Sequence, residues 1–169
     1  MHDTAAPERS GPEKAPCVNA APVAPRHLVA PCGLDCSRCV SCSEGRVVGL
    51  ARELMGLLGE NFHAYAARLQ SINPALAEYA QFRLVLESFA QDRCGGCRSG
   101  TRVCLPSCNV MACTTARGVE FCFQCEAYPC TNTGLPEPVL VKWRRQNDRM
   151  REAGIEVYLK ELAETPRYP

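Results

Sequence analysis

The sequence predicts a small, α-rich, cysteine-rich fold in which helices pack beside irregular cysteine knuckles, with little β structure. Thirteen of the 169 residues are cysteine, a density typical of disulfide scaffolds and of metal-stabilised domains. Apolar residues recur at helical spacing in the middle of the chain and near its C-terminus. The length suits one domain and a tail. Together these observations predict a single metal-stabilised domain.

Proline and alanine are frequent in the first 26 residues, which show no periodic apolar pattern. Such a segment buries too little apolar surface to offset the entropy lost on ordering, so we expect a disordered tail over 1–26 and a single cysteine-rich metal-binding domain over 27–169. Cys17, alone in this tail, is interpreted as a free thiol. The start lacks the apolar core of a secretory signal, and no stretch approaches the roughly 18 apolar residues of a membrane span. We therefore expect a cytoplasmic protein that does not bind membranes.

The region 44–90 is predicted to be helical because its apolar residues recur every three or four positions. The first stripe consists of Val47, Leu50, Leu54 and Leu57, widened by Val48, Ala51, Met55 and Leu58. Ser43 is suited to cap this helix and Gly59 to end it. A second short helix is expected around Phe62, Tyr65, Ala66 and Leu69. Asn73-Pro74 then starts a helix whose apolar face, interpreted as core, comprises Leu76, Tyr79, Phe82, Val85, Leu86 and Phe89.

Residues 94–130 contain eight cysteines among Gly, Pro, Ser and Thr, so short turns and knuckles are expected there. Within this block MACTTARG is expected to form one or two helical turns, and VEFCFQC a short strand entering a knuckle. Helix is predicted again over 138–164, after Pro136 and Pro138, with Gly154 between two helices and Pro166 after the second. The residues expected to face inward are Val139, Leu140, Trp143, Met150, Ile155, Tyr158, Leu159 and Leu162.

Twelve cysteines fall into two blocks that suit metal ligation. The predicted ligands are Cys32, Cys36 and Cys39 in the knuckle 32–42, with Cys42 as a further candidate, and Cys94, Cys97, Cys104, Cys108, Cys113, Cys122, Cys125 and Cys130 in the block 94–130. Cys36/Cys39, Cys94/Cys97 and Cys122/Cys125 form C-x-x-C turns, and two such turns brought together make a tetrahedral four-sulfur site. The odd number of cysteines and the absence of a secretory signal disfavour a disulfide framework.

The identity of the metal is left open by the spacing, because all-cysteine sites suit both zinc and iron–sulfur clusters. Zinc is preferred since structural zinc is the commoner use of C-x-x-C pairs. A [4Fe–4S] cluster is the alternative, because Cys32-x3-Cys36-x2-Cys39 has the spacing by which radical-SAM enzymes hold a cluster. The chain is too short for the barrel of such enzymes, which excludes that chemistry. Pairing Cys94/Cys97 with Cys122/Cys125 in one zinc site is plausible, although spacing does not establish it.

Three function classes follow from these patterns. The preferred class is a non-catalytic protein in which zinc holds a surface for a protein partner. The second is an iron–sulfur protein that transfers electrons or carries an open-site cluster. The weakest is a zinc-knuckle nucleic-acid binder, suggested by a basic helix with Lys142, Arg144, Arg145, Arg149 and Arg151. The net charge of only +1 favours a solvated face for that helix instead, and no catalytic triad or phosphate-binding loop is present.

The order of the motifs resembles domain of unknown function 3795, a family of small cysteine-rich bacterial and archaeal proteins. The resemblance rests on CGLDCSRC, then CGGC about fifty residues later, C-x3-C, C-x4-C, GVEFCFQCEAYPC and a closing PRY, and it covers Leu28 to Tyr168. It implies no activity. Because Cys42 is not among the usual cysteines of the family, the resemblance implies that a site in the first knuckle takes a ligand from the second block. The anaerobic distribution of the family keeps the iron–sulfur alternative open.

Overall fold

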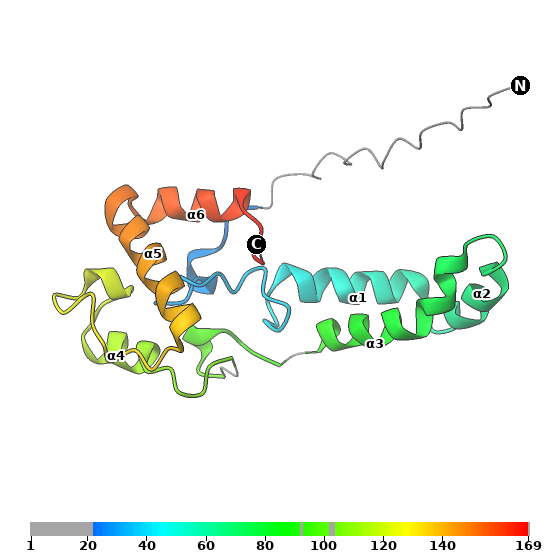
Figure 1. The fold of residues 1–169 in the computed structure, drawn as a ribbon, viewed down its shortest axis with the longest axis horizontal. Coiled ribbons are helices and arrows are strands. Elements are labelled where there is room, and N and C mark those ends of the chain that lie inside the picture. The colour runs from blue at the N-terminus through cyan, green and yellow to red at the C-terminus, as the bar shows by residue number, and fades with distance from the viewer. Residues whose placement is uncertain (1–21, 92, 102–103, 169) are drawn as a thin grey trace, which may run out of the picture.

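The computed structural model describes residues 22–91, 93–101 and 104–168, and it consists of helices and loops (Figure 1). The α-helices are α1 (Arg46–Leu58), α2 (Phe62–Leu69), α3 (Tyr79–Ala90), α4 (Val110–Ala116), α5 (Glu137–Ala153) and α6 (Ile155–Glu164). The 3₁₀ helices are η1 (Arg26–Leu28), η2 (Pro74–Glu78), η3 (Cys97–Ser99) and η4 (Cys122–Gln124). Within the described ranges, β structure is limited to the isolated bridges Val29–Asp35 and Cys42–Cys94. The prediction of an α-rich, cysteine-rich fold is confirmed.

Residues 1–21 of the tail predicted over 1–26, including Cys17, lie outside the described residues. The end of this segment packs on the domain: Ala24 is buried in an apolar cluster, and the Arg26 guanidinium pairs with Glu120 at 2.5 Å. Packed structure therefore begins before residue 27, where the domain was predicted to start.

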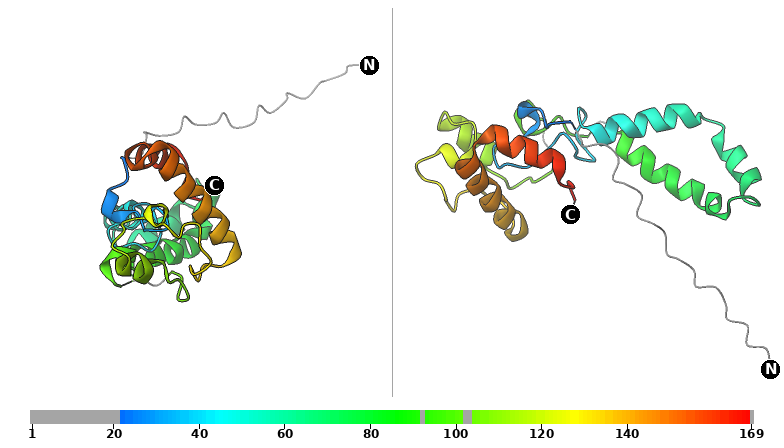
Figure 2. Two further views of the ribbon diagram at one scale, coloured as in Figure 1. Left: turned by 90° about the vertical axis from the view of Figure 1, so that its left-hand side faces the viewer. Right: turned by 90° about the horizontal axis from the view of Figure 1, so that it is seen from above.

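The helices form two parts with different surroundings. α1, α2 and α3 make a helical arm, in which α1 packs along α3, while α4, α5 and α6 surround the cysteine loops (Figure 1). The view from above in Figure 2 shows the arm extending clear of α5 and α6. The C-terminal helices thus pack beside the knuckles as predicted, whereas the middle helices project from them. Among the described residues, no helix is both long and apolar enough to cross a bilayer.

The core lies beneath α5 and α6. One apolar cluster joins Val29 and Phe121 to Met150, Tyr158, Leu159 and Leu162, and a second joins Ala30, Cys32 and Val110 to Trp143. Every C-terminal residue predicted to face inward is buried or half-buried. These clusters attach the two helices directly to the backbone that carries the first cysteines, which positions the site described below.

Several residues on the apolar faces of the middle helices are exposed in the arm. Val48 and Ala51 of α1 are buried, but Leu50 and Leu57, from the stripe predicted first, are 50% and 79% exposed. In α3 the prediction that Phe82 is core is wrong, because its side chain is 46% exposed. The physical reason is that each helix of a narrow arm has one neighbouring face to bury, while these helices are apolar on two.

Most helix ends follow the predicted signals, but the N-cap of α1 is Gly45 and not Ser43, and no side chain caps it. Gly59 (φ +71°) and Gly154 (φ +84°) end α1 and α5, and the Asn73 side chain accepts a hydrogen bond from the Ala75 amide at the start of η2. The short strand predicted for VEFCFQC is wrong: Cys122–Gln124 is a 3₁₀ turn, and the Cys125 amide donates to the Cys122 carbonyl at 3.1 Å.

Two glycine-to-alanine changes should alter stability in opposite directions. Gly33 has φ +90°, and a Cβ there would lie 2.8 Å from the Cβ of Gln146, so Gly33→Ala should lower the free energy of unfolding by about 1–3 kcal/mol. Gly56 lies inside α1, and a Cβ added to it would meet nothing within 4 Å, so Gly56→Ala should raise the free energy of unfolding by about 0.5–1 kcal/mol. Urea unfolding measures both; effects of equal sign would contradict the packing described here.

Candidate metal centres

The first cysteine knuckle is a series of turns with a three-residue repeat. The amides of Cys39, Cys42 and Gly45 donate to the carbonyls of Cys36, Cys39 and Cys42, at 3.1, 3.4 and 2.7 Å respectively. These turns curl the backbone so that the Cys42 thiol lies near those of Cys36 and Cys39. The knuckle therefore brings three thiols near one another.

The buried carboxylate of Asp35 holds this knuckle together. Asp35 is 1% exposed. Its Oδ1 accepts from the Ser37 amide at 2.8 Å and from the Ser37 hydroxyl, and its Oδ2 accepts from Arg38 Nε at 2.9 Å. These bonds compensate the cost of removing the charge from water. Arg38 also donates to the Leu162 and Thr165 carbonyls, so the same contact fixes the knuckle to the end of α6.

The C-terminal PRY sequence closes over the same loop. Arg167 Nε donates to the Asp35 carbonyl at 2.7 Å, and the Val40 amide donates to the Tyr168 hydroxyl at 3.2 Å. The Tyr168 hydroxyl also interacts with the Cys39 thiol. The last motif of the sequence pattern therefore acts as a brace for the first one.

A first group of thiols forms where the knuckle meets the second block. A hydrogen bond with Cys97 lowers the pKa of the Cys36 thiol to about 7, whereas hydrogen bonds with Cys104 and Cys36 raise the pKa of Cys97 far above its usual value. Cys32 lies beside this group, and burial raises the pKa of its thiol to about 12, with further increases from the nearby Cys108. The contacts bring Cys36, Cys97 and Cys104 together from both blocks.

Cys42 meets Cys94 at a second point between the blocks. The two residues form a parallel bridge, the Ser43 amide donates to the Cys94 carbonyl at 2.8 Å, and the Gly96 amide donates to the Cys94 sulfur at 3.4 Å. Burial, followed by the nearby Cys36, Cys94 and Cys39 thiols, raises the pKa of Cys42 to about 11. The structure thus brings a second-block cysteine to the knuckle; that such a cysteine is a metal ligand there stays a prediction.

The third group lines a cavity of its own. Cys113, Cys122, Cys125 and Cys130 surround a space of about 60 Å³ beneath α4. Turns with a three-residue repeat recur here, because the Cys125 amide donates to the Cys122 carbonyl and the Tyr128 amide to the Cys125 carbonyl. This cavity groups Cys122 and Cys125 with Cys113 and Cys130 rather than with Cys94 and Cys97, the arrangement considered from spacing.

Two further side chains approach the thiols of this cavity: Arg117 lines it, and Trp143 lies beside Cys122. Arg117 interacts with Cys125 and Cys113, whose negative charges would raise the pKa of its guanidinium. Burial raises the pKa of Cys122 to about 11, and the approach of the Trp143 indole partly opposes this rise. The indole N–H has no geometrically sound hydrogen bond among the described residues. A thiolate at Cys122 would satisfy that donor, so the pocket is chemically suited to ionised, metal-bound sulfur.

All twelve cysteines in the described residues are free thiols. Within the same residues, no three His, Cys, Asp or Glu side chains are already arranged to hold a metal ion. Ligation in any of the three groups therefore requires rotation of thiols about their Cα–Cβ bonds. His27 and His63 lie away from the thiol groups, exposed beside Glu44 and the Glu60 carbonyl.

Sequence reasoning missed the residues that support the thiols. Asp35 and Arg38 stand inside the CGLDCSRC motif, and their alternation with cysteine was a signal that could have been interpreted as a local ion pair. Arg117 and Trp143 carry no such signal, because they approach the thiols only after α4 and α5 have folded.

Comparison with known proteins gives one match. A family model described as Protein of unknown function (DUF3795) matches residues 28–134, a range that includes all twelve cysteines of the two blocks. The match ends before α5, α6 and the closing PRY, which the sequence resemblance had included. No curated protein and no solved structure matches the chain.

Removal of the Asp35 carboxylate should destabilise the domain strongly. Asp35→Ala leaves Arg38 and Ser37 without their buried partner, so we expect a loss of about 3–5 kcal/mol in the free energy of unfolding. Glu87→Ala is the control, because its ion pair with Arg83 is partly exposed and joins neighbouring turns of one helix, so it should contribute about 0.5 kcal/mol or less. Urea unfolding followed by circular dichroism compares them; similar losses would contradict a supporting role for Asp35.

Proposed function

The chain belongs to the DUF3795 family of proteins of unknown function, and from that premise we propose that it is a metal-binding protein in which cysteine thiolates hold structural zinc. The observation that carries the proposal is the cavity lined by Cys113, Cys122, Cys125 and Cys130. Four thiolates around one space are the ligand set of tetrahedral structural zinc. The unsatisfied indole N–H of Trp143 beside Cys122 supports an ionised sulfur there.

The thiols at the cavity suit a single ion. Cys113, Cys122, Cys125 and Cys130 line a space of about 60 Å³, and four thiolates bind tetrahedral zinc. The same ligand set also holds a [4Fe–4S] cluster, so the preference for zinc rests on its being the commoner use of C-x-x-C pairs. The iron–sulfur alternative keeps its support at the first knuckle, where Cys32, Cys36 and Cys39 have a spacing also used for clusters.

A structural role is supported by what the cysteine segments lack. Between α3 and α5, the longest helix in the described residues is the seven-residue α4, and the rest is turns. Burial raises the pKa of the Cys32, Cys42 and Cys122 thiols, so the protein alone favours their neutral form. A bound cation would reverse that preference, and its binding free energy would add to the stability of the fold.

The proposal includes a protein partner and a cytoplasmic location. The partner is supported by the exposed stripe of Leu50, Leu54 and Leu57 on α1, since an apolar stripe along a projecting arm is costly to leave in water. The location is supported by the free state of every described cysteine. A nucleic-acid partner has less support, because Arg149 and Arg151 of the basic helix are paired with Glu161 and Asp148.

Metal analysis of the purified protein tests the proposal. The full chain, prepared without oxygen and without a metal-affinity tag, should contain zinc and be colourless, and a chelator should unfold it. Replacing Cys122 and Cys125 together by Ser should remove one equivalent of zinc, because two of four ligands are lost. Elemental analysis beside circular dichroism measures both effects.

Cys17→Ser is the matched control, since Cys17 is predicted to be a free thiol outside both blocks; its zinc content should equal that of the wild type. If the purified protein is brown and contains iron with a matching amount of sulfide, the zinc proposal is wrong and the iron–sulfur alternative takes its place. A metal-free, folded protein would contradict both.

A further inference from the structure

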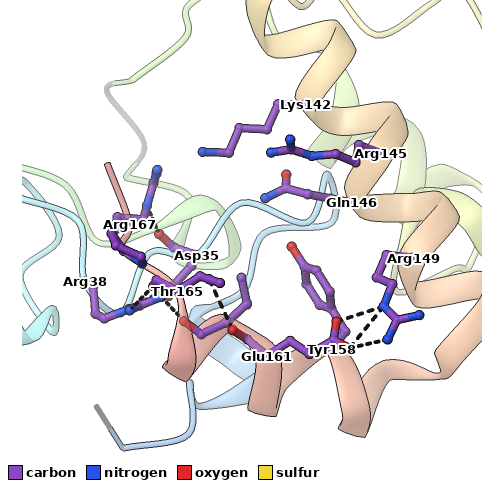
Figure 3. Close-up of a pocket in the computed structure, with 12 residues that line it drawn as sticks. Asp35, Arg38, Lys142, Arg145, Gln146, Arg149, Tyr158, Glu161, Thr165 and Arg167 are labelled. Carbon is purple, nitrogen blue, oxygen red and sulfur yellow. Dashed lines mark hydrogen bonds and ion pairs between the residues drawn. The ribbon is translucent and has the colours of Figure 1, made fainter. Parts of the chain in front are cut away.

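A second candidate site lies outside the thiol groups, between α5, α6 and the C-terminal segment (Figure 3). It is a pocket of about 520 Å³, within the range of about 300–1,000 Å³ that is usual for small-molecule sites. Five cationic side chains and two acidic ones line it, namely Arg38, Lys142, Arg145, Arg149, Arg167, Asp35 and Glu161. The pocket therefore holds an excess of three positive charges, although the whole chain carries only +1.

The excess charge belongs to three of the five cations. Arg38 is neutralised by Asp35 and Arg149 by Glu161. In the part of the chain that the structure describes, no carboxylate pairs with Lys142, Arg145 or Arg167. Figure 3 shows Lys142 and Arg145 extending from α5 on the same side as Gln146, with Arg167 across the pocket.

The three charges lie close enough to affect one another. Burial lowers the pKa of Lys142, and the charges of Arg167 and Arg145 lower it further. Gln146 reaches the same pocket, is 8% exposed, and has a buried Oε1 without a hydrogen-bond partner among the described residues. The like charges destabilise the empty pocket, and an anion would relieve their repulsion. The Gln146 Oε1 accepts hydrogen bonds, so it suits a hydroxyl or amine of the organic part and not a phosphate oxygen.

We propose that this pocket binds a small organic molecule carrying a phosphate group, held by Lys142, Arg145 and Arg167. Guanidinium groups bind phosphate oxygens in pairs and an ammonium adds a point charge, so three cations match a group of three oxygens with about two negative charges. Tyr158, Leu162 and Pro166 line the same pocket and offer apolar surface to the organic part. Asp35 and Arg38 of the pocket wall belong to the first knuckle, so the pocket adjoins that knuckle.

The distribution of charge favours a small molecule over a nucleic acid. Arg151 is paired with Asp148. Arg144 lies on a neighbouring hollow that it shares with Arg145 and with the carboxylates of Glu137 and Asp148. Lys142, Arg145 and Arg167 are gathered in one concave space, and the carboxylates beside Arg144 and Arg151 interrupt the basic strip along α5 that a phosphate backbone requires.

Titration calorimetry of the full chain tests the assignment with pyrophosphate, inorganic phosphate and citrate as probes. We expect pyrophosphate to bind with one-to-one stoichiometry and more tightly than citrate, which carries the carboxylate alternative. Lys142→Gln and Arg145→Gln should each weaken pyrophosphate binding by about tenfold or more, the loss expected for one charge-assisted hydrogen bond. Neither side chain makes a hydrogen bond or ion pair within the described residues, and each adds to the repulsion in the pocket, so both variants should melt at or slightly above the wild-type temperature.

Arg144→Gln is the matched control, because it removes the same charge from the adjacent position of α5 but lines the other hollow. Its pyrophosphate affinity should stay within about twofold of the wild type. Equal weakening in all three variants would overturn the proposal in favour of general electrostatic attraction. Absence of pyrophosphate binding would also overturn the proposal, and so would tighter binding of citrate than of pyrophosphate. It would be overturned as well if an RNA oligonucleotide bound more tightly than pyrophosphate and Arg144→Gln weakened that binding as strongly as Lys142→Gln and Arg145→Gln do.

Discussion

The buried side-chain amide of Asn147 on α5 hydrogen-bonds to both cysteine blocks and so fixes their relative position. Its Nδ2 donates to the Cys32 carbonyl at 3.0 Å, and its Oδ1 accepts from the Phe123 amide at 3.0 Å. Asn147 is fully buried between Trp143 and Met150 of the same helix, so unsatisfied donors and acceptors would be costly if either side of the contact moved. Because the cysteine loops have no sheet or long helix of their own among the described residues, α5 supplies the rigid element against which both blocks are placed.

That dependence explains the division of the molecule. The C-terminal helices bury their apolar faces on the cysteine loops through Val29, Phe121 and Trp143, while the arm has only itself to pack against and leaves Leu50 and Leu57 in water. A surface helix that is apolar on two sides exposes apolar side chains to water, which costs free energy. A partner that covers those side chains would offset this cost. The arm and the cysteine module therefore contribute different things: the module fixes thiols, and the arm presents apolar surface.

Much of this architecture follows from local signals in the sequence, and the rest does not. Gly59, Gly154 and Asn73 end or begin helices as expected, because caps act within one turn of the chain. Which cysteines lie together depends instead on how α4 and α5 place turns that are distant in the sequence. Spacing suggested that Cys122 and Cys125 pair with Cys94 and Cys97, whereas the structure places them around one cavity with Cys113 and Cys130. The net charge of +1 does not predict the charged pocket, because acidic residues elsewhere in the chain balance its excess of cations. The sequence identifies Lys142 and Arg145 as basic but does not indicate that they share a pocket with Arg167.

The extent of the family match separates the two sites. All twelve thiols of the two blocks lie within the matched residues 28–134, and so do Asp35 and Arg38, which order the first knuckle. Lys142, Arg145 and Arg167 lie beyond the match, as do Asn147 and the PRY brace. Membership of the family therefore bears on the cysteine sites and on the Asp35–Arg38 wall of the pocket, but it does not bear on the three cations of the pocket, whose evidence is entirely their own geometry. Arg167 connects the two, because it lines the pocket while its Nε donates to the Asp35 carbonyl of the first knuckle; an anion bound by Arg167 would therefore contact the side chain that braces the knuckle.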